Sequence, residues 1–132
     1  MKILIIEDEY LIAEGVSLTL QSAGHEVTGI AEDLSSALAL AGQERPDMAF
    51  VDIKLANGSS GLDVARALKG MGVTCVFATG NPPNKAQAGG VGLGYIAKPF
   101  SPRVLVQTAA FVAGVLSSGA SAAMAPNGFN TL

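Results

Sequence analysis

The sequence predicts an α/β fold in which a doubly wound, five-stranded parallel sheet is covered by helices on both faces. Short apolar runs alternate with segments of helical periodicity along the 132-residue chain, and polar residues follow these runs directly. A run in which every residue is apolar places apolar side chains on both faces of a strand, which is typical of parallel strands buried between two layers of helices. The chain length fits one domain with a core of its own.

Each strand in this prediction is a short apolar run that ends at a polar residue. The first is residues 3–6, followed by a helix over residues 10–23 and by Gly24, at the position of a glycine that ends a helix. The other strands are expected at residues 25–30, 48–51, 74–78 and 95–97. The other full-length helices are expected at residues 33–43, 61–69 and 102–117.

Residues 81–94, where the fourth helix belongs, depart from this pattern. They contain two prolines and four glycines, and only residues 85–88 favour a helix. We therefore predict a fourth helix that is short, about one turn, or disordered. Residues 119–132 are small and uncharged, and we expect them to form a mobile tail after a domain that spans residues 1–118.

The composition excludes several classes of function. The 11 acids and three of the eight bases lie in residues 1–63, which carry a net charge of −8, whereas residues 64–132 carry +5. The overall charge of −3 does not suit a protein that binds nucleic acid by neutralising phosphates. Cys75 is the one cysteine, which excludes an internal disulfide and a multi-cysteine zinc site. The longest apolar stretch is too short to span a membrane, and we expect a cytoplasmic protein.

Five polar residues follow the predicted strands at their carboxyl ends, where ligands bind in sheets of this kind. They are Glu7, Asp8, Asp52, Thr79 and Lys98. Oxygen ligands with no histidine or cysteine nearby favour Mg²⁺. Asp52 is the candidate nucleophile because it stands alone at the tip of the central strand, and Lys98 and Thr79 suit the oxygens of a phosphoryl group.

The segments around these residues stand in a characteristic order along the chain. They are Glu7-Asp8 after ILII, Asp52 after MAFV, Thr79 in FATG, Tyr95 in GYIAKPF and the pair Lys98-Pro99. In this order they resemble the receiver domain of two-component response regulators, over residues 1–118. The resemblance implies a flavodoxin-like fold and a single-domain regulator. FATG is similar to the FATGUY motif of one receiver subgroup, from which the sequence departs after the glycine.

The resemblance also implies how the chain would carry a signal. Asp52 would accept a phosphoryl group from a histidine kinase or a histidine phosphotransfer protein, and Lys98 and Thr79 would bind that group. Thr79 and Tyr95 would change position on phosphorylation, and Pro99 would follow a cis peptide bond. The chain would then signal through protein contacts.

A metal site is implied by the same resemblance. Mg²⁺ would be held by Asp8, Asp52 and the main-chain carbonyl of Lys54, with Glu7 acting through water. The chain would catalyse only its own phosphotransfer and autodephosphorylation, and would not be an enzyme for other substrates.

The downstream partner is left open by the sequence. The helix expected at residues 102–117 has no charge after Arg103 and carries apolar residues, such as Val106, outside its core stripe. An apolar outer face of this kind is a candidate for a docking or homodimer surface. Nucleic acid and membranes are not expected as partners.

Two alternative functions remain open from the sequence. One is a pseudo-receiver that serves as a docking module without being phosphorylated. The other is a Mg²⁺-dependent phosphohydrolase that forms an aspartyl phosphate. Such a hydrolase generally needs a general acid two residues after its nucleophile, where this chain has Lys54, and an inserted cap over the substrate.

Overall fold

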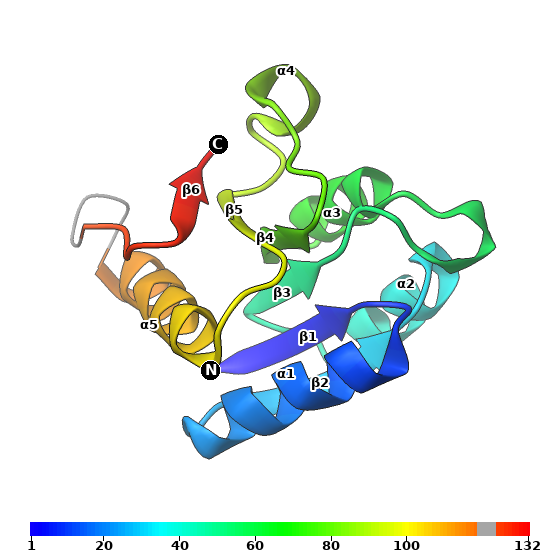
Figure 1. Cartoon of the computed structure of the whole chain (residues 1–132). Helices are drawn as coiled ribbons and strands as arrows, with labels where there is room; N and C mark the ends of the chain where they lie inside the picture. The colour runs from blue at the N-terminus through cyan, green and yellow to red at the C-terminus, as the bar shows by residue number, and fades with distance from the viewer. Residues whose placement is uncertain (119–123) are drawn as a thin grey trace.

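A six-stranded sheet in the order β2-β1-β3-β4-β5-β6 forms the centre of the computed structural model, which describes residues 1–118 and 124–132 (Figure 1). The strands are β1 (Lys2–Ile6), β2 (Glu26–Ala31), β3 (Met48–Val51), β4 (Thr74–Thr79), β5 (Gly94–Ala97) and β6 (Phe129–Thr131). The helices are α1 (Tyr10–Ser22), α2 (Leu34–Gln43), α3 (Gly61–Gly70), α4 (Lys85–Ala88) and α5 (Pro102–Ser118), with a 3₁₀ turn at Ala56–Gly58. Strands β1 to β5 are parallel, and their order confirms the predicted doubly wound fold.

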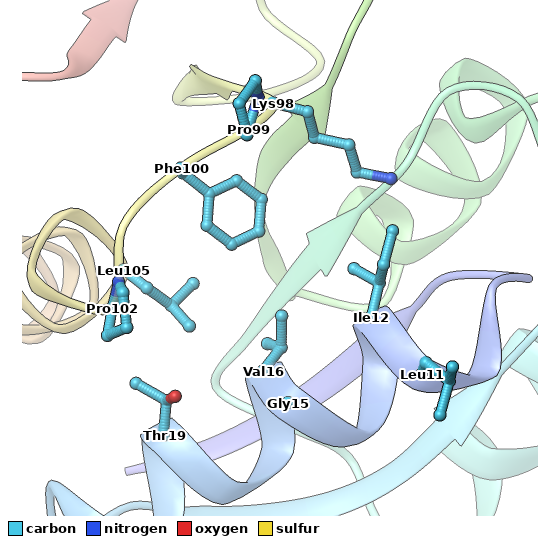
Figure 2. A pocket seen from close by; sticks show the side chains of 10 residues that line it. All are labelled: Leu11, Ile12, Gly15, Val16, Thr19, Lys98, Pro99, Phe100, Pro102 and Leu105. Carbon is cyan, nitrogen blue, oxygen red and sulfur yellow. The ribbon is translucent and has the colours of Figure 1, made fainter.

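Helices α1 and α5 cover one face of the sheet. Side chains of a strand alternate between its two faces, so Ile3 and Ile5 of β1 point together toward this layer. They are buried with Val16 of α1 and Leu105 of α5. Figure 2 shows Phe100 and Leu105 directed toward Val16, at the edge of this layer where the chain enters α5.

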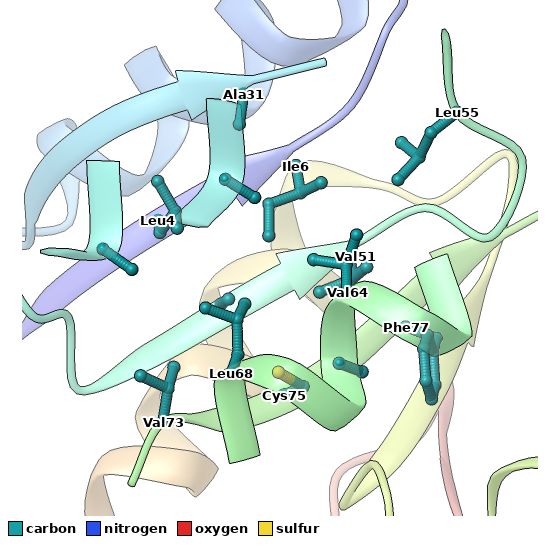
Figure 3. Packing of buried hydrophobic residues seen from close by; sticks show 14 of the residues in the cluster. Leu4, Ile6, Ala31, Val51, Leu55, Val64, Leu68, Val73, Cys75 and Phe77 are labelled. Atoms are coloured by element: carbon teal, nitrogen blue, oxygen red, sulfur yellow. The ribbon is translucent and has the colours of Figure 1, made fainter. Parts of the chain in front are cut away.

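Helices α2 and α3 cover the opposite face. Ile6 of β1 and Phe77 of β4 pack there against Val64 and Leu68 of α3, and all four side chains are almost completely buried (Figure 3). Cys75 lies in the same core, and burial raises the pKa of its thiol to about 12. The two cores hold β1, β3 and β4 from both sides, which fixes the positions of the residues that follow these strands.

The fourth helix, α4, is one turn long, which confirms the prediction that it is short. A reciprocal cap holds it: the Asn84 side chain accepts a hydrogen bond from the Gln87 main chain at 2.9 Å, and the Gln87 side chain accepts one from the Asn84 main chain at 3.3 Å. Only Ala88 of the helix is buried. The segment therefore buries little apolar surface, which is typical of elements with low local stability.

Helix α5 has 17 residues and buries one stripe of its surface. The buried residues are Leu105, Thr108, Ala109 and Val112. Leu116, near its end, is 47% exposed. Neither α5 nor any other helix in the described parts of the chain is both long and apolar enough to cross a membrane.

The sixth strand is a correction to the predicted five. β6 pairs antiparallel with β5, and the sequence missed it because a three-residue strand with one buried side chain, Phe129, has no detectable periodicity. A mobile tail was expected for residues 119–132. Residues 119–123 lie outside the described part of the chain, whereas residues 124–132 are described and include β6.

Candidate functional site

Three carboxylates meet at the carboxyl ends of β1 and β3. These strands are parallel neighbours in which Ile6 lies opposite Val51, so the residues that follow them emerge side by side. Glu7, Asp8 and Asp52 each place a carboxylate oxygen within 4.8 Å of the others. Glu7 and Asp52 are buried and Asp8 is exposed. The three acids that the sequence places after strands thus form one cluster.

Lys98 reaches this cluster from the end of β5. Its Nζ lies 2.8 Å from Asp52 Oδ2 and also forms an ion pair with Glu7 Oε1. Burial by itself would lower the pKa of Lys98, but the hydrogen bonds to Asp52 and Glu7 outweigh it and raise the pKa. The Lys98 main chain is held too, since its N–H donates to the Thr79 carbonyl at 2.9 Å. Lys98 therefore stays protonated beside Asp52.

The Asp52 carboxylate has a fixed orientation. Its Oδ1 accepts a hydrogen bond from the main-chain N–H of Ile53 at 2.7 Å, while its Oδ2 faces Lys98. Its main-chain N–H donates to the Ile6 carbonyl at 2.9 Å, so the backbone is anchored to β1. One oxygen is thus used for positioning, and the other lies next to a positive charge.

Glu7 is the acid most affected by its surroundings. Burial, as the largest cause, raises its pKa to about 7, and the nearby Asp52 adds to this, although the hydrogen bond from Lys98 acts in the opposite direction. Among the described residues no hydrogen-bond partner exists for the buried Glu7 Oε2. A buried carboxylate oxygen without a partner, next to two more carboxylates, fits a hard divalent cation such as Mg²⁺.

We expect Glu7→Gln to stabilise the metal-free protein at high pH. The pKa of Glu7 is about 7 in the folded protein and 4.5 in its ordinary state. Its favourable contribution to the free energy of unfolding is therefore complete below about pH 4.5 and is lost as the pH rises through 7. Glutamine does not titrate, so the variant does not lose this stability. Urea unfolding with a chelator should show the variant gaining about 1–3 kcal/mol over wild type between pH 5 and pH 8.

The control for this measurement is Glu9→Gln. Glu9 is an exposed acid of the same loop. This variant removes one negative charge from the same loop and leaves the buried Glu7 carboxylate unchanged, so it measures the effect of charge removal alone. A flat difference between Glu7→Gln and this control would contradict the assignment of the raised pKa to Glu7.

Thr79 lies at the end of β4 but does not bind the acidic cluster in this structure. Its side chain is 2% exposed, and its hydroxyl accepts a hydrogen bond from the Asn81 N–H at 3.1 Å and contacts the Asn81 carbonyl at 3.4 Å. Both of these contacts lie within its own loop. Thr79 thus ends a strand of the sheet as predicted, but its hydroxyl is hydrogen-bonded to the Asn81 main chain.

The other residues singled out in the sequence have distinct positions. Tyr95 is half-buried in β5, opposite Phe77 of β4. Lys54 is exposed, and its backbone forms an isolated bridge with Ser60. The peptide bond between Lys98 and Pro99 is cis. Tyr95 is therefore on the strand that leads directly to the lysine of the site, three residues before it.

Gly61 was expected from the sequence to keep the loop after Asp52 flexible, but its close contact with Asp52 was not predicted. Its N–H donates to the Ile53 carbonyl at 2.7 Å, which draws the start of α3 against Asp52. A Cβ at this position would lie 1.9 Å from the Asp52 carbonyl oxygen, so a side chain cannot be accommodated without moving Asp52. The available signal was a glycine at the first position of a helix, where it has no advantage in helix propensity.

An apolar groove of about 470 Å³ runs beside the site, between α1 and the chain that joins β5 to α5 (Figure 2). Lys98 forms part of its wall, together with Ile12 and Phe100. Leu11, also on the wall, is 84% exposed. The groove therefore provides an apolar surface that adjoins the lysine bound to Asp52.

Comparison with known proteins matches the chain to one family. The family model of the response regulator receiver domain matches residues 3–110. The phyllosphere-induced regulator PhyR of Methylorubrum extorquens is 39% identical over 104 residues, which cover 76% of this chain and 39% of that protein. The phosphate regulon transcriptional regulatory protein PhoB of Pseudomonas aeruginosa is 39% identical over 111 residues, which cover 79% of this chain and 48% of that protein. The chain spans less than half the length of these two relatives.

Solved structures agree with this match. The solution structure of the PhyR response regulator REC domain of Erythrobacter litoralis has a TM-score of 0.77 at 28% identity, over 93% of this chain and 95% of that one. The chemotaxis protein CheY4 of Vibrio cholerae has a TM-score of 0.77 at 30% identity, over 84% of this chain and 97% of that one. The fold described above is therefore shared with these proteins over most of their length.

Proposed function

Because the chain belongs to the response regulator receiver domain family, we propose that its Asp52 accepts a phosphoryl group from the phosphohistidine of a histidine kinase or a histidine phosphotransfer protein. The observation that carries this proposal is the placement of Asp52 Oδ2 at 2.8 Å from Lys98 Nζ, beside two further carboxylates. The protein would act in the cytoplasm as a signalling protein, and the reactions it catalyses would be its own phosphorylation and dephosphorylation.

The surroundings of Asp52 prepare it for attack. The Ile53 N–H holds Oδ1, which leaves Oδ2 directed at Lys98 and at an incoming phosphorus. Attack by Oδ2 forms the O–P bond while the P–N bond of the phosphohistidine breaks, and the bonding electrons leave with the imidazole. Lys98 then donates to a phosphoryl oxygen and neutralises part of the added negative charge.

The acidic cluster would hold Mg²⁺ during this reaction. Asp8, Asp52 and the main-chain carbonyl of Lys54 are the proposed ligands, with Glu7 acting through water. When bound, the metal supplies positive charge to the phosphoryl oxygens. The unpartnered, buried Glu7 Oε2 supports this assignment, since it is an oxygen for which the described residues offer no hydrogen bond.

Thr79 and Tyr95 would report the phosphorylated state. The Thr79 hydroxyl would leave its bonds to Asn81 and donate to a phosphoryl oxygen, so the start of the loop toward α4 would move with it. This loop leads to a helix of a single turn, which a small bias can rearrange. Tyr95 is half-buried in the adjacent strand and would adjust to the new position of the loop.

The phosphodonor would be seated in the apolar groove between α1 and the β5–α5 connection. Lys98 contributes to the wall of this groove and contacts Asp52, so a donor in the groove lies next to the nucleophile. The exposed Leu11 supports an apolar contact with the donor. A homodimer through α5 stays a separate prediction.

We expect acetyl phosphate to label the protein with one phosphoryl group when Mg²⁺ is present, and a chelator to abolish the labelling. Intact-mass spectrometry measures the incorporated group, and titration of Mg²⁺ back into the chelated sample should restore it. Absence of labelling under all conditions would contradict the proposal and favour the unphosphorylated docking module. Repeated turnover of p-nitrophenyl phosphate would instead favour the phosphohydrolase.

A further inference from the structure

The chain covers the edge of its own β5 strand with β6. Antiparallel pairing places Thr131 opposite Gly94, Asn130 opposite Tyr95 and Phe129 opposite Ile96. The Leu132 N–H extends the pairing by donating to the Leu93 carbonyl at 3.2 Å. Without β6, the edge of β5 would present unpaired main-chain groups, which is how a sheet binds an additional strand.

A pocket for one aromatic ring accompanies this edge. The Phe129 side chain is 8% exposed, and its ring centroid lies 5.2 Å from that of Phe111 of α5, with the planes at 54°. A Cβ on Gly94 would lie 2.3 Å from Phe129 Cζ, so the absence of a side chain at Gly94 makes room for the ring. Strand β5 and helix α5 together thus form a groove that accepts an extended segment with a phenylalanine.

The occupant of this groove is bound without any charged side chain. Residues 124–132 contain no acidic or basic side chain, and no charged residue follows Arg103 in the sequence. Recognition therefore rests on main-chain pairing and on the Phe129 ring. A segment of another molecule with these two properties would satisfy the same groove.

Strand β5 connects this groove to the phosphorylation site. Ile96 pairs with Phe129, and Lys98, two residues further on, binds Asp52 and Glu7. Tyr95, which pairs with Asn130, is the residue expected to respond to phosphorylation. Figure 1 shows β6 beside β5, on the side of that strand away from β4. The groove and Lys98 are therefore joined by one strand of four residues, so a movement of Lys98 toward a phosphoryl group would act on the same strand that pairs with β6.

We propose that the β5–α5 groove is a strand-docking site that the segment 124–132 occupies as an internal ligand, and that a partner protein binds by inserting an extended, phenylalanine-bearing strand in its place. Phosphorylation of Asp52 moves β5 and so changes the balance between β6 and the partner strand in the groove. This coupling rests on the proposed function. Because β6 is tethered, it competes at an effective concentration of roughly millimolar. The groove stays closed to weak ligands until β6 is loosened.

The test uses the full-length chain and a fluorescent peptide with the sequence of residues 124–132. The full-length Phe129→Ala variant, which retains the groove but lacks the anchoring ring, should bind the peptide at least about tenfold more tightly than wild type. A peptide in which alanine replaces the phenylalanine should not bind to either protein. Failure of the folded variant to bind the unaltered peptide would overturn the proposal.

A second measurement covers the case in which Phe129→Ala does not fold. In isotope-labelled wild type, excess unlabelled peptide should shift the NMR signals of Asn130 and Thr131 to those of an unstructured chain, because the peptide replaces β6. Unchanged signals at saturating peptide would overturn the proposal.

The coupling to phosphorylation is tested separately. With Mg²⁺ and beryllofluoride, a mimic of the phosphoryl group, peptide affinity should change severalfold, and by linkage the peptide should change the affinity for the mimic by the same factor. Peptide binding without acetyl phosphate labelling would retain the groove and reject the proposed function. Labelling with an unchanged peptide affinity would retain the proposed function and reject the coupling.

Discussion

Asparagine at position 52 should abolish labelling by acetyl phosphate. The amide has nearly the shape of the carboxylate, and its oxygen can still accept the hydrogen bond that Ile53 donates. Its NH₂ group cannot accept the hydrogen bond from Lys98, but Lys98 keeps Glu7 as a partner. An amide oxygen is a very weak nucleophile, and no O–P bond forms. Mass spectrometry of the Asp52→Asn variant with Mg²⁺ should therefore show only unmodified protein.

The matched control is Asp47→Asn. Asp47 precedes β3, whereas Asp52 follows it, so the control changes an acid at the opposite end of the same strand. Asp47 is exposed, and the hydrogen bond that it accepts from the Lys2 N–H at 2.8 Å can be kept by asparagine. This variant should be labelled like wild type. Full labelling of Asp52→Asn would show that another group, such as Glu7 or Asp8, is the nucleophile.

The second large effect is expected for Gly61→Ala. A Cβ at position 61 would lie 1.9 Å from the Asp52 carbonyl oxygen and 2.7 Å from Ile53 Cα, and backbone atoms cannot yield as a flexible side chain can. The start of α3 must move away from β3, and this breaks the bond from the Gly61 N–H to the Ile53 carbonyl. We expect a loss of about 3 kcal/mol or more in the free energy of unfolding, measured in urea.

Labelling should respond to the same substitution, because Asp52 and Gly61 share this contact. In the folded fraction of Gly61→Ala, acetyl phosphate should label Asp52 more slowly than in wild type. Gly42→Ala is the control, since Gly42 lies in α2 with nothing within 4 Å of an added Cβ, and alanine should stabilise that helix by up to about 1 kcal/mol. Equal stabilities of Gly61→Ala and Gly42→Ala would contradict the close contact.

The acidic part of the site could be predicted from the sequence, because its residues follow directly after predicted strands. Glu7, Asp8 and Asp52 follow apolar runs, and parallel pairing of β1 with β3 then brings them together without further information. The double contact of Lys98 with Asp52 and Glu7 could not be predicted in the same way, because it depends on a long side chain that crosses the end of β4. Burial of Glu7, which raises its pKa, is likewise a property of the packed layers.

Strand β6 and the orientation of the Thr79 hydroxyl could not be predicted, because neither produces a periodic pattern in the sequence. β6 has three residues, and its pairing depends on the space that Gly94 leaves for Phe129, a contact between positions 35 residues apart. The orientation of the Thr79 hydroxyl toward Asn81 is set by the loop conformation. The short α4, in contrast, was predictable, because the prolines before residues 85–88 and the glycines after them limit any helix there.

The ammonium of Lys98 serves the acidic cluster as a built-in counter-ion. Three carboxylates within 4.8 Å would repel one another in a folded chain without metal, and the Lys98 charge offsets part of that repulsion from inside the protein. Part of the charge balance of the site is therefore supplied by the fold itself and not by a divalent ion. Under the proposed function, loss of Mg²⁺ would slow the phosphorylation of Asp52, while Lys98 would still offset the charge of the cluster.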